Sequence, residues 1–131
     1  MIRLKRIYET ASKQDGKRLL VERLWPRGVK KTLARLDDWL KEVAPSPALR
    51  SWFSHDPAKW NTFRRRYYIE LDGKPEAWEP IMGAARHGRV TLIFSSRDIE
   101  HNNAVALKQY LDRKMTKSVA SSIERSFSEA A

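Results

Sequence analysis

The chain has 131 residues, of which 41% are hydrophobic and 32% charged, a balance typical of one globular domain and not of a disordered chain. It contains no cysteine, which excludes disulfide bonds, thiolate zinc sites and cysteine nucleophiles and is compatible with a reducing cytoplasm. Its formal net charge is +10, with 17 Lys and Arg against 7 Asp and Glu in residues 1–66 but 9 against 9 in residues 67–131, so the basic first half favours anionic partners.

The first part of the chain is expected to supply two strands. Apolar and basic residues alternate over residues 2–8, as in a strand with one buried face. Residues 12–16 form a turn, and residues 18–24 have a continuous apolar centre, which is typical of a strand covered on both faces. Proline and glycine within residues 25–28 then end the strand in a loop.

The middle of the chain is expected to be helical. Apolar residues recur at helical spacing over residues 33–43, although an extended segment over residues 37–43 is an equal alternative. Ser46 and Asp56 are each followed by proline, which predicts that they cap two further helices. The second of these carries one apolar stripe and is closed by the Asp-Gly pair at residues 72–73.

The last part of the chain combines helices with the clearest strand. A helix entered near Pro75 is expected within residues 74–87; a start shifted by Pro80 is the alternative, because proline is best tolerated in a first turn. Residues 89–94 are almost continuously apolar, as in a buried strand. A final helix is expected to begin near His101, and its apolar pattern weakens over residues 116–131.

This order of elements predicts the α/β class: a small, mostly parallel sheet flanked by helices on both faces. Residues 1–115 are expected to form a single domain, and residues 116–131 a C-terminal tail that is either a partly ordered helix or frayed. Ligands of such sheets bind beyond the carboxyl ends of the strands, where the loops at residues 25–28 and 95–101 are expected to meet.

The N-terminus interrupts its apolar residues with charge, unlike a signal peptide. No stretch approaches the roughly 20 apolar residues that cross a bilayer. We therefore expect a cytoplasmic protein without a membrane association. Nothing in the sequence fixes its oligomeric state.

The loop after the second predicted strand has the composition of an anion clamp. Arg23 and Arg27 flank a rigid turn that contains Trp25 and Gly28. Guanidinium groups match the geometry of carboxylate and phosphate oxygens, and an exposed Trp25 ring can stack on a ligand. The alternative is that Trp25 packs as a lid on the core and the arginines pair with the aspartates at residues 37–38.

A second polar group follows the predicted strand at residues 89–94. Ser95, Ser96 and Asp98 precede a helix start that also carries His101 and Asn102. Free amides and the helix dipole favour a negative group at such a position. Ordinary capping by Asp98 or a serine is the alternative, but one cap is sufficient.

Two histidines are candidates for acid–base chemistry, because imidazole titrates near neutrality. His55 precedes a predicted helix and His101 lies at the start of another, although a lone loop histidine is more often a surface hydrogen-bonding group. The histidines have no metal-binding spacing, and neither a dinucleotide-binding glycine motif nor a phosphate loop is present. We therefore expect no metal and no cofactor.

A basic run on a predicted helix offers a second mode of binding. Arg64, Arg65 and Arg66 follow a tryptophan and precede two tyrosines, a combination that can bind a nucleic-acid backbone. A solvated helix face is the more ordinary interpretation.

Four runs in one uninterrupted order resemble a known family. They are residues 21–28 (VERLWPRG), residues 39–46 (WLKEVAPS), residues 52–57 (WFSHDP) and residues 101–105 (HNNAV). On these motifs the chain is similar, over about residues 1–114, to the YeaO-like family of bacterial proteins, the domain-of-unknown-function group DUF 488. The resemblance implies a small α/β protein, usually a lone domain, and no activity.

The shared motif residues include those that the chemistry singles out, with two departures. Glu22 stands where aspartate is more common in the family, and Asn103 where histidine is frequent, which weakens any mechanism that needs that histidine. We predict a strand-end pocket for a small anionic or phosphorylated ligand, with hydrolysis or group transfer left open. A basic nucleic-acid-binding protein and a non-catalytic interaction module are the alternatives.

Overall fold

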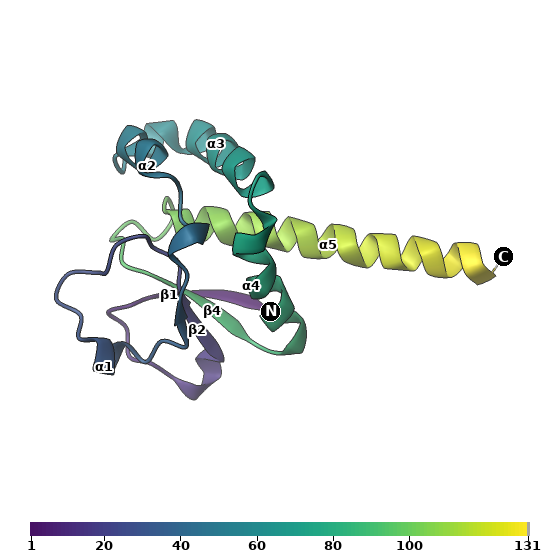
Figure 1. The fold of residues 1–131 in the computed structure, drawn as a ribbon, viewed down its shortest axis with the longest axis horizontal. Coiled ribbons are helices and arrows are strands. Elements are labelled where there is room, and N and C mark those ends of the chain that lie inside the picture. Colours follow the sequence, from purple (N-terminus) through teal and green to yellow (C-terminus); the bar gives the residue numbers. More distant parts are fainter. Residues whose placement is uncertain (131) are drawn as a thin grey trace.

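The computed structural model describes the backbone of residues 1–130, together with the side chains of residues 1–117, 123 and 124. Four strands form one parallel sheet in the order β1-β4-β2-β3 (Figure 1). The predicted α/β class and parallel sheet are therefore confirmed.

The predicted strands form the centre of this sheet. β1 (Ile2–Arg6) and β2 (Lys17–Leu20) flank β4 (Val90–Phe94), all five residues of which are buried. The short edge strand β3 (Asp38–Trp39) completes the sheet beside β2. β2 ends at Leu20, before the end of the predicted strand at residue 24. Beyond Leu20 the chain turns away toward the loop that leads to residue 28.

The turn between β1 and β2 explains the need for glycine at position 16. Gly16 has a φ of 63°, and a Cβ atom there would lie 2.2 Å from the carbonyl oxygen of Arg89. No other residue fits this left-handed conformation so close to a neighbouring backbone. Asp15, one residue earlier, belongs to the 3-10 turn Lys13–Asp15 and closes a capping box with Ser12.

Four helices build the larger core on one face of the sheet (Figure 1). They are α2 (Pro47–Phe53), α3 (Trp60–Asp72), α4 (Pro75–His87) and α5 (Asn103–Ala130). Their buried apolar residues pack on alternate side chains of the strands, including Leu19, Val90, Leu92 and Phe94. The predicted apolar stripes of these helices are confirmed.

The caps that the sequence predicts for α2 and the following segment are present. Ser46 Oγ accepts a hydrogen bond from the Leu49 backbone N–H at 3.2 Å. Asp56 Oδ1 accepts one from the Ala58 N–H at 3.0 Å and begins a 3-10 turn, Pro57–Lys59, that leads directly into α3.

The predicted entry of α4 near Pro75 is confirmed, and the alternative of a start shifted by Pro80 is wrong. The helix begins at Pro75 and contains Pro80 in its interior. Pro80 is exposed, so water can hydrate the carbonyl that loses its intrahelical donor, while Trp78 and Ile81 bury the opposite side of the helix.

The predicted helix over residues 33–43 is wrong, and the extended alternative over residues 37–43 is correct only in its first part. Lys31–Ala34 form one α-helical turn (α1), which the left-handed Arg35 (φ 48°) ends, whereas Asp38–Trp39 are extended and Lys41–Val43 form a 3-10 turn. The backbone N–H of Asp37 then donates to the Arg18 carbonyl, and that of Leu40 to the Leu20 carbonyl. Pairing with the open edge of β2 therefore outweighs the local helical pattern.

The second face of the sheet is consequently covered differently from the first. A single turn, α1, and the irregular chain around it pack on a smaller core. Its buried members are Ile7, Leu20, Ala34 and Ile93, with Trp25, Val29, Leu36 and Trp39 packed against them.

The helix α5 begins at Asn103, two residues after the predicted start, because Asn102 is its cap: Asn102 Oδ1 accepts from the Val105 N–H at 3.0 Å. The predicted inward residues Ala104, Leu107, Tyr110 and Leu111 are buried. The helix then continues beyond residue 115 and projects from the body to Ala130 (Figure 1). The predicted domain boundary at residue 115 stays a prediction.

Within the described residues, no helix has the length and apolar character that a membrane crossing requires.

Candidate ligand-binding site

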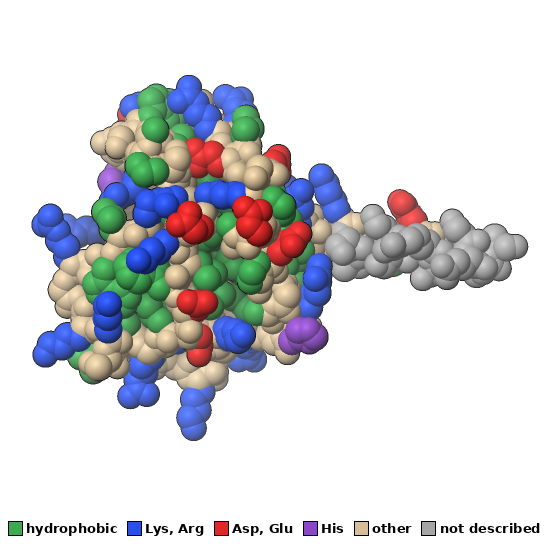
Figure 2. Space-filling view, in the orientation of Figure 1, with side chains coloured by type: hydrophobic (Ala, Val, Ile, Leu, Met, Phe, Trp, Pro, Cys, Tyr) green, Lys and Arg blue, Asp and Glu red, His purple; other side chains and the backbone are tan. Residues whose placement is uncertain are grey.

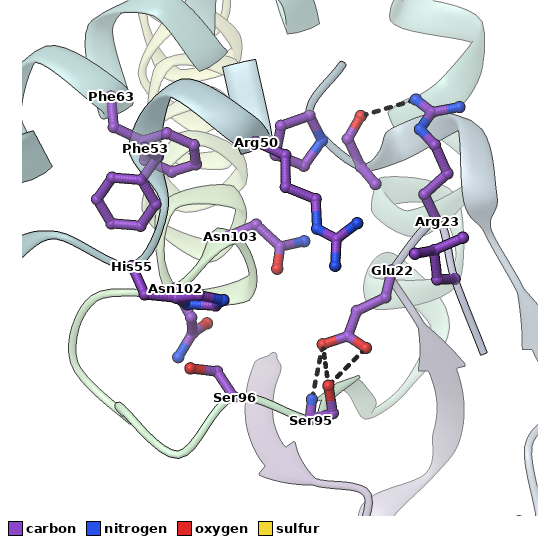
Figure 3. Close-up of a pocket in the computed structure, with 13 residues that line it drawn as sticks. Glu22, Arg23, Arg50, Phe53, His55, Phe63, Ser95, Ser96, Asn102 and Asn103 are labelled. Carbon is purple, nitrogen blue, oxygen red and sulfur yellow. Dashed lines mark hydrogen bonds between the residues drawn. The ribbon is translucent and has the colours of Figure 1, made fainter. Parts of the chain in front are cut away.

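A cavity of about 140 Å³ opens at the carboxyl ends of β2 and β4, between the loops that follow them, α2 and the start of α5 (Figure 3). This is the edge at which the sequence predicts a site. Its apolar walls come from Leu24, Ala44, Pro45, Phe53 and Phe63. Its polar lining consists of Glu22, Arg23, Arg50, His55, Ser95, Ser96, Asn102 and Asn103.

Five of the predicted site residues line this cavity and five do not. Those that line it are Arg23, His55, Ser95, Ser96 and Asn102. Those that lie outside its lining are Trp25, Arg27, Gly28, Asp98 and His101. The cavity therefore joins the two predicted loops, but through different members than the sequence indicates.

Glu22 connects the two strand-end loops. Its Oε1 accepts hydrogen bonds from the backbone N–H of Ser95 at 2.7 Å and from the Ser95 hydroxyl at 2.8 Å. The same hydroxyl lies 2.8 Å from Oε2. This carboxylate, which in the sequence stands out only as a departure from the family pattern, holds the ends of β2 and β4 together.

Arg23 lies at one side of the cavity and is only partly engaged. Its Nη2 donates to the Ala44 carbonyl at 3.4 Å, and its Nη1 lies 3.9 Å from the exposed carboxylate of Glu42. Its Nε is buried without a hydrogen-bond partner among the described residues. The alternative, in which the arginines pair with the aspartates at residues 37–38, is not formed by Arg23; the Asp37 carboxylate instead accepts from the Arg18 backbone N–H.

Arg50 is the residue that sequence reasoning missed. It comes from α2, and Figure 3 shows its guanidinium group projecting into the cavity toward Glu22. Within the part of the chain that the structure describes, its side chain forms no hydrogen bond and no ion pair. A signal was available, because Arg50 is the one charged residue of α2 and lies one turn before Phe53, which also lines the cavity.

An aromatic floor and a strained turn complete the site. Phe53 and Phe63 stack with their ring centroids 4.3 Å apart. Between α2 and α3, Ser54 and His55 have φ values of 45° and 56°, a left-handed pair that turns the His55 side chain to the cavity. Such conformations cost free energy for residues other than glycine and persist only where surrounding packing holds them.

Asp98 and His101 are paired with each other in the loop before α5. His101 Nδ1 lies 3.0 Å from Asp98 Oδ2, and the His101 ring packs edge-on against Trp60 with centroids 5.4 Å apart. The backbone N–H groups of Glu100 and His101 also donate to this carboxylate, and these hydrogen bonds lower the pKa of Asp98. These contacts fix the loop and keep both side chains out of the cavity lining.

Trp25 packs on the other face of the sheet, against the smaller core, in agreement with the alternative that it serves as a lid on the core. Its ring meets Trp39 edge-on at 5.2 Å, and its Nε1 donates to the Val29 carbonyl at 2.8 Å. Arg27 is exposed, with its backbone carbonyl accepting from the Tyr8 hydroxyl, and Gly28 has a left-handed φ of 75°. The clamp of Arg23 and Arg27 is therefore not formed.

The basic run on α3 lies outside the cavity lining. The Arg64 guanidinium donates to Gln109 Oε1 at 2.9 Å and to Asn61 Oδ1 at 2.6 Å. Arg65 donates to Thr62, and the Arg66 guanidinium lies 4.2 Å from the ring centroid of Trp52. Figure 2 shows many Lys and Arg side chains on the molecule, with Asp and Glu side chains among them on the visible face.

Comparison with known proteins identifies the family. A family model described as "Inactive DUF488-N3 subclade" matches residues 1–128, beyond the limit near residue 114 expected from the motifs. The uncharacterized protein YeaO of Escherichia coli strain K12 is 39% identical over 110 residues, which cover 84% of this chain and 96% of that protein. The uncharacterized protein Rv3073c of Mycobacterium tuberculosis H37Rv is 35% identical over 111 residues, covering 85% and 93%.

No solved structure matches the chain. The family model and the two relatives each span most of the sequence, and the relative from Escherichia coli carries the name that the motifs indicate. The chain belongs to the DUF488 family of YeaO-like proteins.

Proposed function

We propose that the protein binds a small molecule with a carboxylate or phosphate group in its strand-end cavity and does not transform it chemically. The observation that carries this proposal is Arg50, whose guanidinium group projects into the cavity without a partner among the described residues. A guanidinium group offers five N–H donors and keeps its charge at any physiological pH. Arg23 adds a second positive charge at the same cavity.

Two features support binding over catalysis. The matching family model is described as inactive. In addition, neither serine of the lining is hydrogen-bonded to a histidine within the described chain, because Ser95 Oγ donates to Glu22 and Ser96 Oγ to the Asp98 carbonyl. A Ser–His pair, the common form of an activated serine nucleophile, is therefore not formed in the lining.

The dimensions of the cavity limit the ligand. A cavity of about 140 Å³ is close to the roughly 150 Å³ of an engineered cavity that holds a benzene molecule. The stacked rings of Phe53 and Phe63 give it an apolar floor. A ligand of about one ring in size, with its anionic group toward the arginines, therefore fits better than a nucleotide.

Titration calorimetry with benzoate, acetate and inorganic phosphate tests this proposal, with Arg50→Ala as the variant and Arg27→Ala as the matched control. A hydrogen bond to a charged group is worth about 1.5–3 kcal/mol, so Arg50→Ala is expected to weaken the tightest of these anions about 10- to 150-fold. Arg27→Ala removes the same charge from outside the cavity and should leave the affinity within about twofold.

Three results would contradict the proposal. One is that neither these three anions nor larger carboxylates such as 4-methylpentanoate and L-leucine bind the wild-type protein. Another is an equal loss of affinity in both variants, which would indicate attraction by overall charge. The third is tight binding of single-stranded DNA that falls steeply with salt, which would favour the nucleic-acid alternative.

A further inference from the structure

We infer that the ligand carries a cationic group as well as an anionic one, as an apolar α-amino acid does. In this assignment Arg50 and Arg23 bind the carboxylate, and Glu22 binds the ammonium group. The inference rests on the proposed function and deepens it, because it adds a second charged group to the same ligand.

The Glu22 carboxylate keeps unused acceptor capacity. An ionised carboxylate has about four acceptor positions. Ser95 supplies two donors, its backbone N–H and one hydroxyl hydrogen shared between Oε1 and Oε2. No other hydrogen bond to these oxygens is formed by the described residues. Because Glu22 lines the cavity, the free positions are available to a donor inside it.

The opposite charges of the cavity face each other without pairing. Figure 3 shows the Arg50 guanidinium directed across the cavity toward Glu22, yet no ion pair within 4.0 Å forms between them. A simple anion between them would gain from Arg50 but be repelled by Glu22, and a simple cation would experience the reverse. A zwitterion gains at both ends.

Asn103 adds an acceptor to the cavity lining. Its Nδ2 donates to the Val21 carbonyl at 2.7 Å, which leaves its Oδ1 for the cavity (Figure 3). An ammonium group has three donors, so it can use Asn103 Oδ1 and Glu22 together. The apolar walls, including Phe53 and Pro45, then suit an aliphatic or aromatic side chain.

Calorimetry on the full chain with matched probes tests the inference. L-leucine is compared with 4-methylpentanoate, which lacks the ammonium group, and with 3-methylbutylamine, which lacks the carboxylate; L-phenylalanine is compared with its two analogues in the same way. The expected result is that at least one amino acid binds 10-fold or more tightly than both of its analogues.

Variants of Glu22 test whether this residue causes the preference for the amino acid over its carboxylate analogue. Glu22→Gln is expected to weaken the amino acid about 10-fold and to leave the carboxylate analogue unchanged or tighter, because it removes a repulsive charge. Glu22→Asp keeps the carboxylate and should retain the preference, which serves as the control for folding.

The outcomes separate the two proposals. If carboxylate analogues bind in an Arg50-dependent manner and neither amino acid binds more tightly than its analogue, the inference is wrong and the proposed function stands. If neither probes nor simple anions bind, both are wrong. A preference for the amino acid that survives Glu22→Gln also overturns the role assigned to Glu22.

Discussion

The two faces of the sheet are stabilised by different means. On the helical face, α2 to α5 satisfy their own backbone hydrogen bonds, and the contact with the strands is almost entirely apolar. On the other face the covering chain is irregular, and side chains from the sheet satisfy its backbone. Arg18 donates to the carbonyls of Ala34 and Arg35, and Thr91 donates to that of Asp15.

This difference shows what covering a sheet with irregular chain requires. Arg18 and Asp15 are 5% and 6% exposed and form an ion pair at 2.6 Å, with Lys5 as a third member. A buried ion pair contributes little by itself, but the removal of one partner is costly. The irregular face therefore depends on a few polar side chains, whereas the helical face depends on the sum of many apolar ones.

The same contrast divides the motif between residues 22 and 28. Glu22 and Arg23 turn to the cavity on the helical side, whereas Trp25 packs on the irregular side. A run of residues that is continuous in the sequence thus lines the cavity at its start and packs on the smaller core further along.

The largest expected effect is on the irregular face. Arg18→Met removes the side-chain donor of two backbone carbonyls and one of the three donors to the Asp15 carboxylate, which keeps Lys5 and the Ser12 N–H, and we expect the free energy of unfolding to fall by about 3–5 kcal/mol. Leu92→Met on the helical face is the matched control, with an expected loss below about 1.5 kcal/mol. Urea unfolding measures both, and equal losses would remove the distinction between the faces.

Truncation of Trp25 comes next. Trp25→Ala removes the edge contact with Trp39 and the donor to the Val29 carbonyl. Because Trp25 is only half-buried, we expect the free energy of unfolding to fall by about 3 kcal/mol, the low end of the range for truncating a core tryptophan. Ligand affinity measured on the folded protein should not change. A large loss of affinity with little loss of stability would instead place Trp25 in the site.

A pH effect of smaller size is expected from Asp15. Burial alone would raise the pKa of its carboxyl group, but hydrogen bonds from the Ser12 N–H and from the Lys5 and Arg18 side chains lower the pKa below its ordinary value. The stabilisation is therefore complete above the ordinary pKa of aspartate and is lost as the pH falls through the lower pKa of the folded state.

Urea unfolding between pH 6 and pH 2 measures this contribution. The wild-type protein should lose more of its free energy of unfolding over this range than Asp15→Asn, which has no proton to gain at that position. Parallel pH profiles for the two proteins would show that Asp15 does not stabilise the folded state through its charge.

The smallest effect is expected at Arg27. Its side chain is exposed and forms no hydrogen bond or ion pair with the described residues. Arg27→Ala should therefore change the free energy of unfolding by no more than about 0.5 kcal/mol. A thermal unfolding curve that shifts by many degrees would show that the second arginine of the motif has a structural role that its contacts do not explain.

Local patterns account for the parts of the fold that the sequence predicts. The buried strand at residues 89–94, the caps at Ser46 and Asp56 and the stripe on α3 each depend on neighbouring residues alone. The segment at residues 33–43 could not be predicted in this way, because its extended half is fixed by hydrogen bonds to β2, about twenty residues earlier.

The candidate site also has one part that the sequence predicts and one part that it does not. The general rule for parallel sheets predicts the correct edge, because it depends only on strand direction. The rule does not say to which face of the sheet a loop residue turns, so Trp25 and Arg27 were grouped with Arg23. Arg50 was missed because its role depends on where α2 lies over the strand ends, which is a tertiary property.

The position at which α5 begins has a mechanical consequence. Its first residue, Asn103, lines the cavity, and its 28 residues form a rod about 42 Å long, of which the initial turns pack on the body. A tilt of about 5° at the base of such a rod moves its tip by about 4 Å, a lever arm set by the rise per residue of an α-helix. A small displacement of the helix start beside the cavity would therefore be amplified at the other end of α5.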